Sequence, residues 1–435
     1  METLKVRESL RREIWQCIII TFSIALTLEV GFRIYDFIKG EVPNENLRAE
    51  ILLSRSWDNP YLQYTSPKDF HGYMYHAEPG RRYRVDTNSY GFRTHEFFPK
   101  PKGTYRILIL GDSFMHGINA NQDETLAVKL EEFLKEKTKK PVEVLSLGVS
   151  SYSGVRYAEL IRLYLRQLTP DMVIVALDVS DMEEDVSRIT QYDLDPEGYP
   201  LVLKNADELM QEQGKHRIII DEAGTLKVIN RGRDWELDLR RSSALIDRIC
   251  QLKYYVRDEL MKIKYSYITK SINSTDQTDH IIRYDDLVAK HGTDLSKILP
   301  KRMLVDTIPY DLETAIKRYE PTLRCLRYIK KETDAKGSEM ILTSYPYPWM
   351  VSTEENLPYQ LHAFNGIYDF RTNKVHSDLV DHFAQELNVK HLNAYPIFEN
   401  QPVHNYGDYD PHFNALGYAR YAEFLATSIQ ERLLQ

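Results

Sequence analysis

The strongest constraint on the fold is a short apolar run that ends in Gly-Asp-Ser. All residues of the 107–110 segment are apolar, which is typical of a strand buried on both faces of a parallel sheet. Gly111, Asp112 and Ser113 end that strand, and an amphipathic segment at 125–137 follows. We therefore expect Ser113 on a strand-to-helix turn at the carboxyl end of the sheet, where α/β folds bind ligands.

Strand-like runs alternate with helix-like periods in two separated parts of the chain. The expected strands are 107–110, 142–147, 172–177, 339–344 and 390–393, and the expected helices are 125–137, 155–167, 312–336, 377–387 and 415–434. This alternation predicts an α/β fold, a three-layer α/β/α sandwich with a five-stranded, mainly parallel sheet. The 435-residue length leaves room for additions to such a domain.

Two stretches do not follow this alternation. Residues 36–104 are rich in Pro, Asn, Tyr and Arg, which predicts a linker and a loop-rich N-terminal region. Residues 186–309 carry short β-like pieces and an amphipathic helix at 243–263, which predicts a large insertion, either a lid over the sheet edge or a separate domain. The α/β domain is then expected to comprise residues 105–185 and 310–435.

An apolar segment at 14–32 predicts an N-terminal membrane helix within residues 1–35. Its length suits a bilayer crossing. Four basic residues precede it, Lys5, Arg7, Arg11 and Arg12, which favours an N-terminus inside the cell and export of the remaining chain. We find no small-residue cleavage site, so we expect a retained anchor rather than a signal peptide. The alternative is a buried amphipathic helix.

Composition and ligand spacing bear on partners and cofactors. The net charge of −8 comes with no basic stripe, which argues against nucleic acid as a partner. No Cys/His spacing is typical of a zinc site, and Asp181 with Asp185 supplies too few ligands for a metal. We therefore expect neither a metal nor an organic cofactor.

A serine nucleophile requires a general base and a group that orients the base. The loop at 405–414 carries both, because His412 precedes the last helix and Asp410 lies two residues before it. Asp408 is an alternative orienting group. The competing interpretation is a solvated turn that happens to contain a histidine.

Three groups could hold the oxyanion that forms when Ser113 attacks a carbonyl. The backbone N–H groups of Ser113 and Gly148 end strands one βα unit apart, and the Ser180 hydroxyl ends the third strand. The alternatives are that Gly148 serves only the turn and that Ser180 only caps a helix.

These stretches together resemble the SGNH/GDSL hydrolase superfamily. Gly111, Asp112 and Ser113 match its first block, Gly148 matches the second, and the pair of Asp410 and His412 matches the last. The resemblance implies that Ser113 is the nucleophile in a triad with His412 and Asp410, on an SGNH or flavodoxin-like sandwich. The segment 88–93, followed by the strand and Gly-Asp-Ser, is similar to the membrane-anchored bacterial members.

The chain departs from the superfamily pattern at two points. The third block normally carries Asn, and here Ser180 stands in its place. The Asp-to-His spacing is two rather than the commoner three, which is similar to polysaccharide O-acetylating relatives. Loss of one oxyanion donor costs on the order of 3 kcal/mol of transition-state stabilisation.

The leading hypothesis is a serine esterase of the bacterial inner membrane, with its catalytic domain outside and an O-acylated glycan or other ester as substrate. A polysaccharide O-acetyltransferase with the same triad is the first alternative. The second is a catalytically silent glycan-binding or assembly protein. Tyr345, Tyr347 and Trp349 follow a strand end and could stack on sugars, although a packed corner is also consistent with them.

Overall fold

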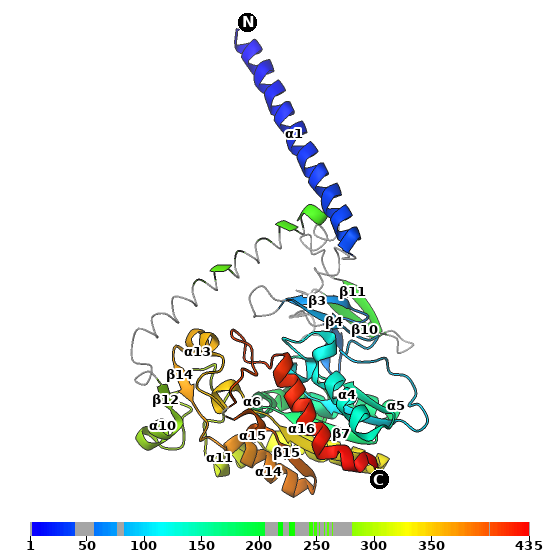
Figure 1. The fold of residues 1–435 in the computed structure, drawn as a ribbon, viewed down its shortest axis with the longest axis vertical. Coiled ribbons are helices and arrows are strands. Elements are labelled where there is room, and N and C mark those ends of the chain that lie inside the picture. The colour runs from blue at the N-terminus through cyan, green and yellow to red at the C-terminus, as the bar shows by residue number, and fades with distance from the viewer. Residues whose placement is uncertain are drawn as a thin grey trace.

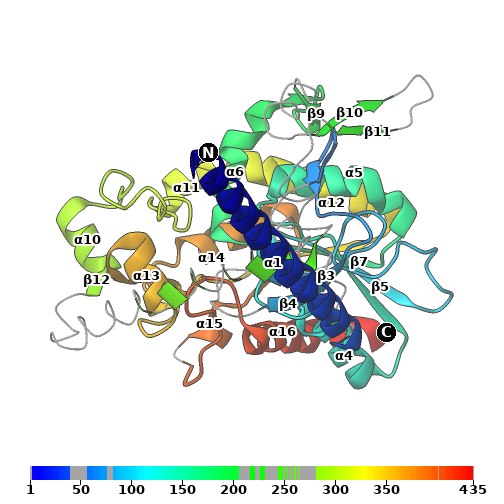
Figure 2. The ribbon, with the colours of Figure 1, turned by 90° about the horizontal axis from the view of Figure 1, so that it is seen from above.

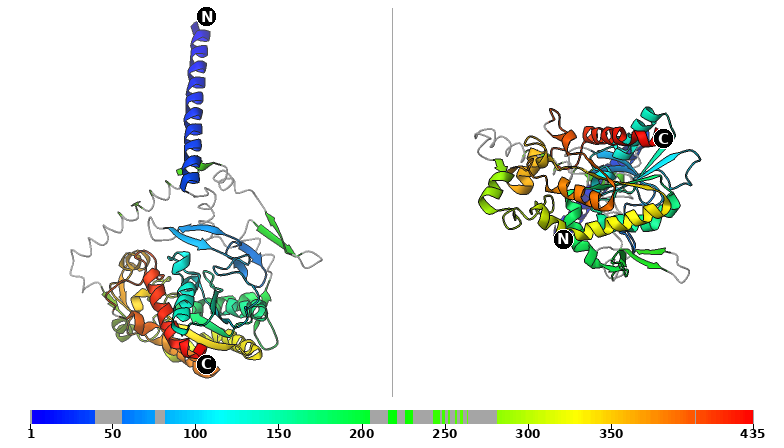
Figure 3. Two further views of the ribbon diagram at one scale, coloured as in Figure 1. Left: turned by 45° about the vertical axis from the view of Figure 1, so that its right-hand side comes forward. Right: turned by 90° about the horizontal axis from the view of Figure 1, so that it is seen from below.

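The structure is a computed structural model that describes residues 2–39, 56–75, 82–204, 216–220, 226–230, 243–246, 248–249, 252, 256, 259–260, 263, 281–399 and 401–434. One long helix, α1 (Glu2–Lys39), projects from the remaining structure (Figure 1; Figure 3, left). Within its segment Arg12–Tyr35, an 18-residue window has a mean hydropathy of 1.9 and none of that window is buried. By length and composition it could cross a membrane, a property that an N-terminal signal sequence shares.

Five strands form the central sheet, and every neighbouring pair is parallel. They are β5 (Tyr105–Leu110), β6 (Val142–Ser146), β7 (Met172–Leu177), β13 (Glu339–Ser344) and β15 (Lys390–Asn393), in the order β15-β13-β7-β5-β6. Counted along the chain this order is 2-1-3-4-5, the flavodoxin-like doubly wound arrangement. The predicted five-stranded α/β fold is confirmed, with a sheet that is parallel throughout.

Helices cover both faces of the sheet and complete the three layers (Figure 2; Figure 3, right). On one face lie α4 (Leu126–Thr138) and α16 (Ala415–Leu434), and on the other lie α5 (Gly154–Leu168), α12 (Glu320–Lys336) and α14 (Val375–Leu387). The core lies between these layers, and all six residues of β7 are buried in it. Burial on both faces explains why this strand is a continuous apolar run.

The helix expected at 312–336 is two helices, so that prediction was wrong in its continuity. α11 (Leu312–Arg318) ends before Tyr319, and α12 begins at Glu320 with Pro321 in its first turn. Proline inside a helix removes one hydrogen bond and clashes with the preceding turn, whereas the first turn tolerates it. The chain therefore ends one helix and starts another.

The other elements lie outside the central sheet. Among the described residues, four antiparallel pairs are β1 (Ser56–Asn59) with β2 (Gln63–Thr65), β3 (His71–Tyr75) with β4 (Arg82–Asp86), β8 (Tyr192–Leu194) with β9 (Pro200–Leu203), and β10 (His216–Ile220) with β11 (Leu226–Asn230). β12 (Ile281–Arg283) pairs in parallel with β14 (Ile367–Asp369). The shorter helices are α3 (Ser113–His116), α6 (Val179–Arg188), α10 (Tyr284–His291), α13 (Leu357–Phe364), α15 (Tyr395–Phe398), η1 (Gln122–Glu124), η2 (Ile189–Gln191) and η4 (Pro348–Met350).

The N-terminal region, expected to be rich in loops, holds the hairpins β1–β2 and β3–β4. In the insertion, β10 and β11 coincide with the expected β-like pieces, and the hairpin β8–β9 is additional. Only some residues of the helix expected at 243–263 are among the described residues. The described residues between 244 and 263 are all helical.

Candidate active site

Ser113 is the first residue of α3, which follows β5 after a two-residue turn. The Asp112 side chain caps this short helix by accepting a hydrogen bond of 2.9 Å from the Phe114 N–H. A side chain at Gly111 would clash with Met115, so the tight turn requires glycine there. The turn thus places the Ser113 hydroxyl at the carboxyl end of a central strand.

The imidazole of His412 lies between Ser113 and Asp410. Its Nε2 is 2.7 Å from Ser113 Oγ, although the two residues are 299 positions apart. Its Nδ1 is hydrogen bonded to Asp410 Oδ1. A carboxylate at Nδ1 keeps the proton on that nitrogen, so Nε2 is the atom free to accept a hydrogen bond from the Ser113 hydroxyl. The His412 side chain is 13% exposed, so a small part of the ring reaches the surface.

Two asparagines hold the loop that carries this pair. Asn119 Nδ2 donates to Asp410 Oδ1 at 3.0 Å, and Asn356 Nδ2 donates to the Asp410 carbonyl oxygen at 2.9 Å. Sequence reasoning missed both residues, because nothing near them in the chain points to Asp410. The alternative orienting group, Asp408, is exposed, and its carbonyl accepts a hydrogen bond from Tyr359. Asp410 is the carboxylate beside His412.

The charges around His412 favour a protonated ring. Burial by itself lowers the pKa of His412, but the carboxylates of Asp410, Asp112 and Asp178 outweigh burial and raise it above its ordinary value. Burial and the neighbouring Asp178 raise the pKa of Asp112, the residue that precedes the serine. The Asp410 carboxylate, which is hydrogen bonded to the ring, is therefore the main group that stabilises an imidazolium.

Gly148 lies directly against the backbone of α3. A Cβ at this position would lie 2.5 Å from the His116 nitrogen, closer than real Cβ atoms approach. The Gly148 N–H is 3.2 Å from Ser146 Oγ, to which it donates. The structure thus brings Gly148 next to the turn that carries Ser113, and its role as an oxyanion donor stays a prediction.

The Ser180 hydroxyl is hydrogen bonded within the fold. It donates a hydrogen bond of 2.8 Å to Asp178 Oδ1, which also caps α6 by accepting from the Asp181 N–H at 3.0 Å. Since a hydroxyl has one proton, Ser180 would have to give up this hydrogen bond to donate to an oxyanion. Its role as an oxyanion donor stays a prediction.

The three aromatic residues proposed to stack on sugars are buried. Tyr345 and Trp349 have no exposed surface, and Tyr347 is 6% exposed. Tyr345 donates its hydroxyl proton to Asp112 at 2.9 Å and Tyr347 donates to Asp178 at 3.0 Å, while Trp349 stacks on Tyr347. This set is a packed corner behind the site, so the sugar-stacking prediction is wrong, and the alternative considered beside it holds.

The segment 88–93 holds the loop that follows α3. Gly91 has a φ of +84°, as its place in a turn requires. The buried Arg93 side chain donates hydrogen bonds to the carbonyl oxygens of Gly117, at 2.6 Å, and Ala120, at 2.8 Å. These carbonyls follow α3 directly, so the guanidinium fixes the loop beyond Ser113. Sequence reasoning recognised the turn but not this function of the arginine.

Asp181 and Asp185 are used within the fold. Asp181 Oδ1 accepts the Tyr157 hydroxyl proton at 3.0 Å, and Asp185 Oδ1 accepts the Val155 N–H at 2.9 Å. Within the described part of the chain, no group of three or more His, Cys, Asp or Glu side chains is placed to hold a metal ion.

Comparison with known proteins finds similarity in structure only. No family model matches the sequence, and no curated protein matches it either. Among solved structures, a catalytic mutant of an acetylxylan esterase from Geobacillus stearothermophilus is 12% identical, with a TM-score of 0.35, over 77% of this chain and 96% of that one. A lipase/acylhydrolase from Enterococcus faecalis is 9% identical, with a TM-score of 0.35, over 75% and 96%. A psychrotrophic esterase from a Pseudoalteromonas species is 10% identical, with a TM-score of 0.29, over 75% and 98%.

The fold and the site agree with the resemblance seen in the sequence. The 2-1-3-4-5 sheet, the serine after the first strand and the Asp/His pair before the last helix are the arrangement that the SGNH/GDSL resemblance implies. We describe the fold as a flavodoxin-like three-layer α/β/α sandwich with an SGNH-type arrangement of Ser113, His412 and Asp410.

Proposed function

We propose that this chain is a serine esterase that acts through Ser113, His412 and Asp410. One observation carries the proposal: residues from the turn after β5 and from the loop before α16 form a continuous hydrogen-bonded series from hydroxyl to imidazole to carboxylate. A solvated turn with an incidental histidine does not explain this series. A hydroxyl in contact with a carboxylate-oriented imidazole is an activated nucleophile.

The proposed reaction has two halves. Ser113 Oγ forms a bond to the ester carbonyl carbon while its proton passes to His412 Nε2. When the tetrahedral intermediate collapses, the ester C–O bond breaks and the His412 proton goes to the leaving alcohol, which leaves an acyl-serine. Water then attacks the acyl carbon by the same route, and the Ser113 oxygen leaves with the proton. Asp410 stabilises the imidazolium at each stage.

Backbone groups are the best candidates to hold the oxyanion. Ser113 begins α3, and N–H groups in the first turn of a helix have no acceptor within the helix. The proposed donors are its N–H and that of Gly148, which lies against the same turn. Such donors contribute about 3–4 kcal/mol each to transition-state stabilisation.

We extend the proposal to location and substrate class. The segment Arg12–Tyr35 would anchor the protein in the inner membrane of a bacterium, and the basic residues before it favour an outer location for the site. An enzyme held there would encounter acylated surface polymers, so an O-acylated glycan is the proposed substrate. A polysaccharide O-acetyltransferase would use the same acyl-serine with a sugar hydroxyl in place of water.

Labelling with a fluorophosphonate probe tests the proposal. The full-length protein in detergent should form a covalent adduct, and Ser113→Ala and His412→Ala should abolish it. Hydrolysis of p-nitrophenyl acetate should fall on the order of 10⁴-fold in either variant. Ser180→Ala is the matched control for the loss of a serine near the site. No labelling of the wild-type protein, or equal labelling of the alanine variants, would instead support a silent glycan-binding protein.

The fate of the acyl group separates esterase from transferase. The acyl-enzyme should release acid into water at a rate that an added oligosaccharide leaves unchanged. If the oligosaccharide accelerates turnover and appears acylated by mass spectrometry, the transferase assignment replaces that of the esterase.

A further inference from the structure

An exposed apolar stripe lies on the helical residues that follow position 243. Its members are Ile249, Leu252, Val256, Leu260 and Ile263, with exposed fractions of 58%, 58%, 47%, 61% and 52%. Their spacings of three and four residues place all five on one face of a helix. Outside α1 and this stripe, the exposed large hydrophobic residues of the described chain are separated along the sequence. We call these five residues the 249–263 stripe.

The start of this helical stretch is attached to α1. The Glu29 carboxylate accepts hydrogen bonds from the Ser243 hydroxyl at 2.8 Å, the Ala244 N–H at 3.1 Å and the Leu245 N–H at 2.8 Å. A carboxylate that caps a helix start both satisfies free N–H groups and complements the helix dipole. The helical residues therefore begin at the C-terminal part of the candidate membrane span.

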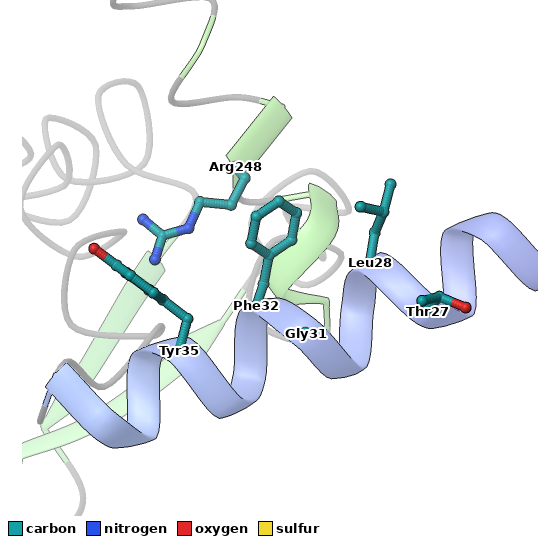
Figure 4. A pocket seen from close by; sticks show the side chains of 6 residues that line it. All are labelled: Thr27, Leu28, Gly31, Phe32, Tyr35 and Arg248. Atoms are coloured by element: carbon teal, nitrogen blue, oxygen red, sulfur yellow. The ribbon is translucent and has the colours of Figure 1, made fainter.

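Arg248 makes a second contact between the two segments, beside a groove on α1. The groove has a volume of about 500 Å³ and is lined by Leu28, Gly31 and Phe32 among others. The Arg248 guanidinium lies 5.9 Å from the centre of the Phe32 ring and 5.7 Å from that of Tyr35 (Figure 4). A cation beside aromatic rings at the end of a membrane span is typical of the headgroup region.

The charges of the same sequence fit an anionic surface. From 248 to 264 the sequence carries Arg248, Lys253, Arg257, Lys262 and Lys264 against Asp258 and Glu259. An apolar face combined with an excess of basic residues is the composition of helices that lie in a membrane interface.

We propose that the 249–263 stripe inserts at the surface of the phospholipid bilayer that α1 enters, so that this segment lies on the membrane as an interfacial helix. The proposal depends on membrane insertion of α1, which is part of the proposed function, and is independent of the chemistry at Ser113. The protein would then contact the membrane at two places, α1 and the 249–263 stripe, which Glu29 joins. Two contacts would restrict how the catalytic domain faces the membrane.

Two features favour a bilayer over a second protein as the occupant of the stripe. Its beginning is joined to the membrane span itself through Glu29, so the first stripe residues lie near the level where α1 leaves the hydrocarbon. The excess of basic residues also complements anionic lipid headgroups. Coverage by a second copy of the chain is the other outcome of the test.

Spin labels in full-length protein test the proposal. Cys17 and Cys250 are first replaced by serine, and the buried Cys325 stays because it is not accessible to the label. Single cysteines are introduced as Leu252→Cys, Val256→Cys and Leu260→Cys, and the protein is reconstituted in phosphatidylcholine–phosphatidylglycerol vesicles. Ile20→Cys in α1 and Phe98→Cys on the exposed surface are the bilayer and water references.

The measurement is the ratio of label accessibility to oxygen and to a water-soluble nickel chelate. We expect the three stripe labels to give a ratio above that of position 98 and below that of position 20. The ratio should fall toward that of position 98 in vesicles of phosphatidylcholine alone. Ester hydrolysis of each labelled sample confirms that the catalytic domain is folded.

Three results would overturn the proposal, each for a different reason. If position 20 lies in the bilayer while the stripe labels match position 98, the anchor is right and the interfacial helix is wrong. If the stripe labels are shielded from both reagents, a protein surface covers them. If position 20 is itself in water, the anchoring fails and this inference fails with it, whereas hydrolysis by Ser113 is judged separately.

Discussion

The Asn119 side-chain amide donates a hydrogen bond of 3.0 Å to Asp410 Oδ1, across 291 positions of sequence. Both residues are buried, and Oδ1 is the same oxygen that contacts the His412 ring. Asn119 also has a φ of +66°, a conformation that asparagine tolerates better than most residues. Through this contact the loop after α3 sets the orientation of the carboxylate that orients the base.

The first prediction concerns this contact. Asn119→Gly removes the amide but keeps a residue that accepts a positive φ, so backbone strain does not confuse the result. A hydrogen bond to a charged group contributes about 1.5–3 kcal/mol, so we expect kcat/KM for an activated ester to fall about 10- to 100-fold. A fall in thermal stability with unchanged kcat/KM would show that Asn119 serves only the fold.

The second prediction concerns pH. A protonated His412 cannot take the Ser113 proton, so kcat/KM should fall as the pH drops through the pKa of His412. Because the surrounding carboxylates raise that pKa above 6.5, the fall should begin at a higher pH than for an ordinary histidine. Asp410→Asn removes one of those charges, so its profile should shift to lower pH while its maximum drops. Identical acid limbs in both proteins would contradict this electrostatic assignment.

The third prediction separates two roles for Ser180. In the structure its hydroxyl donates to Asp178, so Ser180→Ala should lower kcat/KM less than 10-fold, whereas loss of an oxyanion donor costs about 10²- to 10³-fold. The comparison variant is Ser180→Asn, which carries the residue usual in the third superfamily block. A loss of 100-fold or more in Ser180→Ala, at unchanged melting temperature, would assign Ser180 to the oxyanion site.

The fourth prediction tests the close approach of Gly148 to α3. A methyl group in Gly148→Ala would meet the backbone of Met115 and His116, which cannot move aside without displacing the serine turn. Overpacking of this kind costs about 1–3 kcal/mol, and we expect both stability and kcat to fall. Gly337→Ala is the control. Alanine strains the backbone there, because Gly337 has a φ of +70°, but no atom lies within 4 Å of the added methyl group, so this variant loses stability without steric overlap. Normal hydrolysis by Gly148→Ala would show that this loop can move without disturbing Ser113.

Much of the scaffold could be predicted from local pattern. Continuous apolar runs such as β7 mark strands buried on both faces, and the glycine that ends β5 marks the turn at which Ser113 lies. The division of the expected 312–336 helix is not evident from the apolar periodicity, which continues across Pro321, although proline is typical of the first turn of a helix. Local sequence patterns predicted the structure correctly where a strand is buried on both faces or where a tight turn restricts the residue type.

The sequence by itself determined the βαβ alternation, the apolar N-terminal segment and the residue types able to carry ester chemistry. Periodicity, apolar length and turn residues are properties of neighbouring positions, so they can be read without knowing the fold. Only the tertiary structure decided that Asp410 rather than Asp408 faces His412, that Ser180 serves Asp178, and that the aromatic residues after β13 are buried. Each of these depends on which groups from distant parts of the chain compete for the same partner or the same space, and such competition has no signature in local sequence.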